Sequence, residues 1–230
     1  MPGMNILALE TSTESGSCAL LIGDAVVERR CPPGRPHSET LLPLIRELLA
    51  ESGLVFKQLD AVAFGAGPGA FTGLRVACGV AQGLAVGAGL PVVPVCGLEA
   101  MAATVGAPRV VSLLDARMGE VYAAAYTLGD DGYALHGRIH VGAPEAIELP
   151  AGSGWLAAGN ALTAYPLLGE RLQAAGFSLQ PGVLPQAAAV ARLAARRPTA
   201  QIDPALAVPL YIRDKVAKTI VERLGEGGRA

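Results

Sequence analysis

Glycines gather in a segment whose position suggests an anion site. The segment Gly65-Ala-Gly-Pro-Gly-Ala-Phe-Thr-Gly-Leu-Arg75 follows an apolar run and opens a helical pattern. Glycines between a strand and a helix leave backbone N–H groups free to face an anion, which the helix N-terminus also favours. No Gly-Lys-Ser/Thr follows, and Gly65, Gly67 and Gly69 give GxGxG rather than GxGxxG. A phosphate site and a tight, closely packed turn therefore both remain open.

An acidic residue ends the first strand expected in each half of the chain. Glu10 closes the apolar run that begins at Asn5, and Asp115 follows the run Val110–Leu114. Carboxylates at these places could hold a ribose or a metal-bound water, or they could cap the turns. With the glycines, they predict a possible nucleotide cleft. Its candidate residues are Glu10, Thr11, Gly67, Gly69, Asp115 and Arg117.

Histidines and cysteines do not form a recognisable metal site. His136 and His140 lie in a segment that alternates like a strand, where residues four apart are separated by about 13 Å. His37 precedes a helix and is expected to be exposed. The four cysteines include no CxxC pair, which predicts reduced thiols in a cytoplasmic protein. No metal ligands and no Ser/His/Asp set are predicted.

A second group of glycines lies inside a predicted helix, Thr72–Ala88. Gly79, Gly83 and Gly87 are four residues apart and therefore share one helix face. Such a face lets another backbone approach closely, either the sheet of the same lobe or a partner protein. A neighbouring helix, from Ser38 to a stop at Gly53, carries little charge for its length. The candidate interface residues on the two helices are Leu41, Leu42, Ile45, Leu74, Arg75, Cys78, Gly79, Gln82, Gly83 and Val86.

The order of predicted elements indicates an α/β fold with a duplicated plan of β-meander plus helices. The first half begins with three strands at hairpin spacing and continues with alternating helices and strands. The second half repeats this order loosely, and the break is expected near residues 103–108. This gives a first lobe over residues 1–105 and a second over 106–230, and leaves open whether the C-terminal segment packs back on the first lobe. Strands are expected over Asn5–Glu10, Cys18–Ile22, Ala25–Arg29, Leu59–Phe64, Pro91–Val95, Val110–Leu114, Val121–Thr127, Tyr133–Val141 and Trp155–Ala158, and later helices over Ala161–Ala175 and Pro185–Arg197.

The composition restricts the class of protein. Of the 230 residues 51% are hydrophobic, 17% are charged and 29 are glycine, and the formal net charge is −2. This excludes a disordered chain and disfavours a nucleic-acid binder acting alone. The start of the chain lacks a basic secretory region, and prolines and glycines interrupt the uncharged stretch Val76–Leu98, which predicts a cytoplasmic protein with no membrane span. The basic clusters are Arg192, Arg196 and Arg197, and, more weakly, Arg213, Lys215 and Lys218.

Five segments in this order give the chain a resemblance to the TsaB family. Each segment alone is weak, but the combination is specific and spans almost the whole sequence. The segments are Ile6-Leu-Ala-Leu-Glu-Thr-Ser-Thr13, Phe64-Gly-Ala-Gly-Pro-Gly-Ala-Phe-Thr-Gly-Leu-Arg-Val76, Ala81-Gln-Gly-Leu-Ala85, Asp115-Ala-Arg-Met-Gly-Glu-Val-Tyr122 and Pro209-Leu-Tyr-Ile-Arg213.

The resemblance implies the two-lobed actin-like ATPase (ribonuclease H-like) fold. It also implies a noncatalytic subunit of the complex that transfers threonylcarbamoyl to the anticodon-adjacent adenosine of tRNA. The implied partners are a TsaD-like catalytic subunit, paired through the first-lobe helices, and a TsaE-like ATPase at their junction. A homodimer is implied for the chain alone, and tRNA is contacted only through the complex. No cofactor is expected for the chain itself, and ATP or ADP is implied only at the complex interface.

The sequence departs from the TsaD pattern at the metal site of that relative. TsaD binds metal through two histidines of a His-x-x-x-His helix, and Gly97 and Met101 occupy the matching positions here. Neither residue can serve as such a ligand, which points away from catalysis. The alternative reading is a stand-alone nucleotide-dependent kinase or hydrolase of the same fold, and direct tRNA binding is a weaker third possibility.

Overall fold

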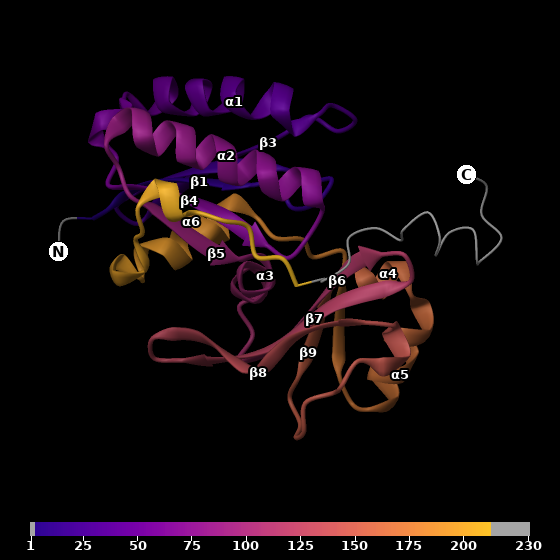
Figure 1. Cartoon of the computed structure of the whole chain (residues 1–230). Helices are drawn as coiled ribbons and strands as arrows, with labels where there is room; N and C mark the ends of the chain where they lie inside the picture. Colours follow the sequence, from indigo (N-terminus) through magenta and orange to yellow (C-terminus); the bar gives the residue numbers. More distant parts are fainter. Residues whose placement is uncertain (1–2, 213–230) are drawn as a thin grey trace, which may run out of the picture.

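The computed structural model describes residues 3–212 and contains two five-stranded sheets, one in each lobe (Figure 1). In the first sheet the strand order is β3-β2-β1-β4-β5, and in the second it is β10-β9-β6-β7-β8. The first sheet consists of β1 (Asn5–Glu10), β2 (Ser17–Ile22), β3 (Ala25–Arg30), β4 (Ala61–Gly67) and β5 (Val92–Cys96). The second consists of β6 (Arg109–Arg117), β7 (Glu120–Gly129), β8 (Gly132–Gly142), β9 (Leu156–Gly159) and β10 (Ser178–Pro181).

The two sheets share one topology. In the first, β1, β2 and β3 form an antiparallel meander, and β4 and β5 add in parallel beside β1. In the second, β6, β7 and β8 form the meander, and β9 and β10 add in parallel beside β6. This repeat confirms the expected duplication and is the plan of the ribonuclease H-like, actin-like ATPase fold.

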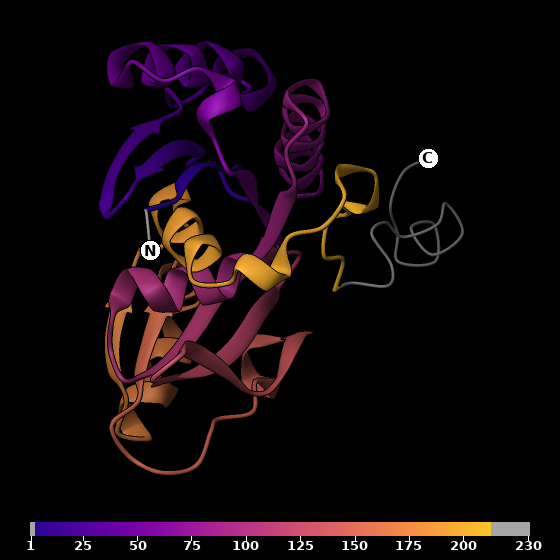
Figure 2. The ribbon, with the colours of Figure 1, turned by 90° about the vertical axis from the view of Figure 1, so that its left-hand side faces the viewer.

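Helices cover both faces of the first sheet (Figures 1 and 2). The alternation of side chains along β1 places Leu7 and Leu9 against α1 (His37–Ser52) and α2 (Phe71–Ala88), and Ile6 and Ala8 against α6 (Ala187–Ala195). The α6 helix thus returns to the first sheet after the second sheet is complete. Within the described residues, α6 therefore packs back on the first lobe, which the sequence left open, and a division at residue 105 stays a prediction.

The remaining helices depart from expectation in two places. One helix was expected over Ala161–Ala175, but the chain forms α4 (Ala161–Ala164) and α5 (Pro166–Ala174), because Pro166 forces Tyr165 out of helical geometry. A further helix, α3 (Gly97–Val105), lies between the two sheets; the sequence pattern predicted no element there, although the match of Gly97 and Met101 to a TsaD helix implied one. Short 3₁₀ helices lie over Phe56–Gln58, Pro144–Ala146, Pro198–Ala200 and Pro204–Leu206.

Among the described residues, α2 alone is long and apolar enough to cross a membrane by length and composition. One face of α2 packs on the first sheet, with Leu74, Ala77, Ala81 and Ala85 buried in the core. Its opposite face is exposed. The expectation of a buried helix is thus correct for only one side of α2.

Candidate functional site

A cleft of about 540 Å³ lies between the two lobes. The first lobe contributes the β1–β2 loop and the first turns of α1 and α2, and the second contributes the β6–β7 turn and Asn160. Neither helix has a side-chain cap at its N-terminus. Of the cleft residues predicted from the sequence, Thr11, Gly69, Asp115 and Arg117 line this cleft.

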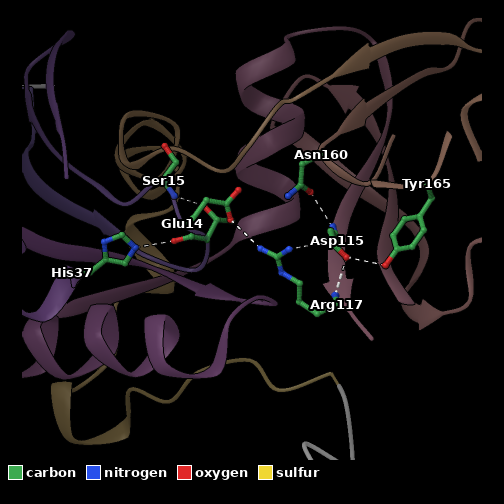
Figure 3. A network of polar contacts seen from close by, with 8 residues as sticks. Glu14, Ser15, His37, Asp115, Arg117, Asn160 and Tyr165 are labelled. Atoms are coloured by element: carbon green, nitrogen blue, oxygen red, sulfur yellow. Dashed lines mark hydrogen bonds and ion pairs between the residues drawn. The ribbon is translucent and has the colours of Figure 1, made fainter. Parts of the chain in front are cut away.

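The side chain of Arg117 reaches across the cleft (Figure 3). Its Nη1 atom lies 3.2 Å from Oδ2 of Asp115 in the second lobe, and its Nη2 atom lies 3.6 Å from Oε2 of Glu14 in the first. Arg117 and Met118 have φ values of 61° and 55°, a left-handed conformation that is uncommon outside glycine. The backbone N–H of Arg117 donates to Oδ1 of Asp115 at 2.9 Å, which stabilises this turn.

Both carboxylate oxygens of Asp115 contact donors of its own chain. Oδ1 also accepts a hydrogen bond of 2.9 Å from the Tyr165 hydroxyl, and the backbone N–H of Asp115 donates to Oδ1 of Asn160 at 2.9 Å. Burial, followed by the hydrogen bond and the charge of Asp115, raises the pKa of Tyr165. Tyr165 therefore stays a protonated donor, and Asp115 acts as the centre of a structural network.

Glu10 lies beneath the cleft rather than in it. Its side chain is completely buried, Oε1 accepts from the Ser12 N–H at 2.6 Å, and Oε2 has no hydrogen-bond partner among the described residues. Burial raises the pKa of Glu10. A Cβ atom added at Gly65 would stand 1.8 Å from Oε2. Glu10 is therefore not available to a ligand, and the expectation that it faces the cleft needs correction.

Close packing explains the other glycines of this segment. A Cβ at Gly73 would lie 1.9 Å from the Thr11 carbonyl oxygen, and one at Gly69 would lie 2.5 Å from the Ser12 carbonyl oxygen. Gly67, which does not line the cleft, has a φ of 115°. Of the two readings left open by the sequence, the tight and closely packed turn is the one that accounts for these residues.

The fold family implies a nucleotide with a divalent cation, and the cleft residues do not fit that cation. Both oxygens of Asp115 are engaged by Arg117 and Tyr165, and Glu10 is turned away. Within residues 3–212 no group of three or more His, Cys, Asp and Glu side chains is placed to hold a metal ion. The cation at the centre of this cleft is the guanidinium of Arg117.

The histidines have structural positions. His37 was expected to be exposed, but it is half-buried, and its Nε2 atom lies 2.8 Å from the Thr13 carbonyl oxygen. This contact fixes the start of α1 to the β1–β2 loop. His136 and His140 lie on β8, where they pair with Ala125 and Ala123 of β7.

The exposed face of α2 is the second candidate site. Cβ atoms added at Gly79, Gly83 and Gly87 would meet no heavy atom within 4 Å. The alternative that this glycine stripe packs against the sheet of its own lobe is therefore wrong. Val86 on the same side of α2 is 69% exposed, and Leu42 on α1 is also exposed.

The structure divides the predicted interface residues into two groups. Leu41, Ile45, Leu74 and Cys78 are buried in the core of the first lobe, so they support the face from below and cannot touch a partner. Helical spacing predicted these residues. Such spacing shows that residues share one face of a helix, but not whether that face points into the core or to solvent. The residues left at the surface are Leu42, Arg75, Gly79, Gly83 and Val86, with Gln82 half-buried.

Fold and sites together define a two-lobed protein of the actin-like ATPase fold that carries an open helix face beside its cleft. A family model described as TsaD, tRNA N6-adenosine threonylcarbamoyltransferase, matches residues 33–154. The Escherichia coli (strain K12) tRNA threonylcarbamoyladenosine biosynthesis protein TsaB is 38% identical over 93% of this chain and 96% of its own length. The chain belongs to the TsaB family.

Other relatives agree with this membership. The TsaB protein of Haemophilus influenzae is 50% identical, over 53% of this chain and 53% of its own. A crystal structure of a Pseudomonas aeruginosa protein, described as similar to peptidase YeaZ, superposes with a TM-score of 0.84 and 37% identity. That match covers 91% of this chain and all of the other.

Proposed function

We propose that this chain is a noncatalytic partner subunit in tRNA threonylcarbamoyladenosine biosynthesis, and that it pairs with a TsaD-like catalytic subunit through the exposed face of α2. The observation that carries the proposal is the glycine stripe, which has open space above Gly79, Gly83 and Gly87. A helix that exposes glycines and Val86 leaves apolar surface uncovered within its own chain. Small residues on such a face allow a partner helix to approach closely.

The absence of catalysis by this chain is supported by its carboxylates. Glu10 is buried against Gly65, and Asp115 is held by Arg117 and Tyr165. Met101 at the second TsaD ligand position is completely buried in the apolar core between α3 and the second sheet. The chain then acts by supporting the conformation of its partner rather than by performing chemistry.

The remaining roles follow from the same proposal. The TsaE-like ATPase docks at the junction of the two subunits in the cytoplasm, and any ATP or ADP binds only at that interface. Two copies of the chain use the α2 face when the partner is absent. Contact with tRNA is made through the complex, and the pairing of Arg197 with Glu99 at 2.9 Å takes one member out of the basic cluster. Arg213, Lys215 and Lys218 lie outside the described residues.

The test is a Gly83→Leu variant in a binding assay with the TsaD-like subunit of the same organism. Leucine at an exposed helix position fits the fold but blocks close helix approach, so we expect at least a tenfold loss of affinity. Ala134→Leu adds similar bulk on the exposed strand β8 and should bind normally. Unchanged binding by Gly83→Leu, with an unchanged melting temperature, would exclude this face as the interface.

The cleft is the observation that favours the alternative, a stand-alone nucleotide-dependent enzyme. Titration of ATP and Mg²⁺ into the isolated chain separates the two functions. The proposal expects no turnover and no shift in melting temperature. Turnover that disappears in an Asp115→Ala variant would establish the alternative instead.

A further inference from the structure

A C-terminal strap, residues 202–212, returns along α2 to the cleft (Figures 1 and 2). It begins at Ile202, which exchanges two backbone hydrogen bonds with Val92 of β5, at 3.0 and 2.9 Å. Near its other end the Leu210 N–H donates to the Ala66 carbonyl oxygen at 2.7 Å. Both ends of the strap are therefore tied to the first sheet.

Side chains of α2 hold the middle of the strap. The Gln82 amide Nε2 donates to the carbonyl oxygens of Pro204 at 2.9 Å and Ala207 at 3.1 Å. The Cys78 thiol lies 3.5 Å from the same Ala207 oxygen. Cys78 and Gln82, which the sequence predicted to contact another protein, thus contact the strap of the same chain. The strap therefore runs along the side of α2 next to the glycine stripe.

The strap presents large apolar side chains to the outside. Leu206 and Val208 are 67% and 68% exposed, whereas Ala207 between them is only 3% exposed. The middle of the strap thus buries its small residue and exposes Leu206 and Val208, whereas Ile202 and Leu210 at its ends pack against the core. This exposure is the reverse of what the stability of the isolated chain favours, and it places apolar surface on the segment that two side chains of α2 hold.

An ordered arginine lies where α2 and the strap meet. The guanidinium carbon of Arg75 stands 3.7 Å from the centroid of the Phe71 ring, and Arg75 Nε donates to the Tyr211 hydroxyl at 3.2 Å. The Phe71 and Tyr211 rings lie 5.7 Å apart. No carboxylate within residues 3–212 forms an ion pair with Arg75. Its charge is thus positioned by two aromatic rings and left for an outside acceptor.

We infer that the strap and α2 form one protein-binding face, in which Arg75 pairs with a carboxylate of the partner while Leu206 and Val208 pack on an apolar helix surface. This inference rests on the proposed function, because it extends the same interface. The occupant is a different protein with a carboxylate beside small and aliphatic residues. A second copy can use the α2 face when the partner is absent, but its α2 contains no acidic residue, so it offers Arg75 no carboxylate from that helix and a different protein fits the face better.

Charge complementarity makes the proposal testable with surface variants. The variants are Arg75→Glu and the double variant Leu206→Ser with Val208→Ser, and the matched control is Arg138→Glu on β8. Affinity for the TsaD-like subunit is measured by calorimetry at low and high salt. We expect about a tenfold or greater loss for each interface variant and none for the control. The affinity of the wild type should fall as the salt concentration rises, and the affinity of Arg75→Gln should fall less.

The outcomes separate this inference from the proposed function. Normal binding by the Arg75 and strap variants, with binding lost in Gly83→Leu, overturns the strap while the α2 interface stands. Normal binding by all of them, Gly83→Leu included, excludes the α2 face as the interface, whereas a wild-type chain that does not bind the TsaD-like subunit removes the proposed function itself. If ultracentrifugation shows that Arg75→Glu changes self-association while heterologous binding is unchanged, the occupant is a second copy and the inference is wrong. Melting curves confirm that each variant is folded.

Discussion

At the scale of single residues, the position of the Glu10 side chain requires that residue 65 has no side chain. The Glu10 carboxylate occupies the space where a side chain at residue 65 would begin, 1.8 Å from a Cβ atom. We expect Gly65→Ala to lower the free energy of unfolding by about 2–3 kcal/mol, because the buried core has no room to move. Gly79→Ala is the control: it fills open space in an exposed helix and should raise stability by about 0.5–1 kcal/mol. Urea unfolding measures both, and a neutral Gly65→Ala would contradict the packing argument.

The protonation of Glu10 gives a second prediction at this scale. Burial raises its pKa in the folded state above the ordinary value of 4.5. Its proton therefore stabilises the fold below the unfolded pKa, and this contribution is lost as pH rises through the folded pKa. Glu10→Gln keeps the acceptor for the Ser12 N–H and cannot ionise. We expect it to be more stable than the wild type at neutral pH and to show a smaller fall in stability between pH 4.5 and 7. If the stabilities of the two proteins change in parallel over this range, the pKa of Glu10 is not raised in the folded state.

At the scale of elements, the strap explains residues that helical spacing alone misassigns. Gln82 Nε2 makes two hydrogen bonds to strap carbonyls, at 2.9 and 3.1 Å. Gln82→Ala should cost about 1–2 kcal/mol of local stability and accelerate hydrogen exchange of the Leu210 amide more than that of amides in β1. Val86→Ala, on the exposed side of α2, should leave this amide unchanged. Equal acceleration in both variants, or in neither, would show that Gln82 does not hold the strap.

Elements whose pattern is local could be predicted from the sequence, and those set by tertiary contacts could not. The meander strands and α2 follow from alternation and from glycines at the ends, and their observed bounds lie close to the expected ones. By contrast, α6 and the strap lie on the first sheet because of contacts with residues more than a hundred positions away, such as that of Ala187 N–H with Ser17 Oγ. Helical spacing likewise gave Leu41 and Leu42 equal weight, although only Leu42 is exposed. Tertiary contacts, rather than local sequence, decide where α6 and the strap lie and which of these leucines is buried.

At the scale of the whole molecule, one side chain connects the two lobes across the cleft. In the described part of the chain, Arg117 to Glu14 is the ion pair that crosses it, and both side chains are largely exposed. Such a pair contributes at most about 1 kcal/mol, so its effect is on lobe orientation rather than on stability. The strained turn that carries Arg117 is consistent with a positional role, because left-handed non-glycine residues each cost about 1 kcal/mol or more.

This predicts a separation of backbone and side-chain effects at residue 117. Arg117→Ala and Arg117→Gly both remove the guanidinium, but the glycine variant should be more stable by about 1 kcal/mol because a φ of 61° suits it. With spin labels on Glu47 of α1 and Ala134 of β8, both variants should broaden the distance distribution between the lobes, whereas Arg138→Ala should not. A distribution as narrow as that of the wild type in both variants would show that packing of α3 and α6 alone fixes the lobes. Broadening in the alanine variant only would assign the effect to the turn, because the two variants lack the same ion pair and differ only in backbone strain.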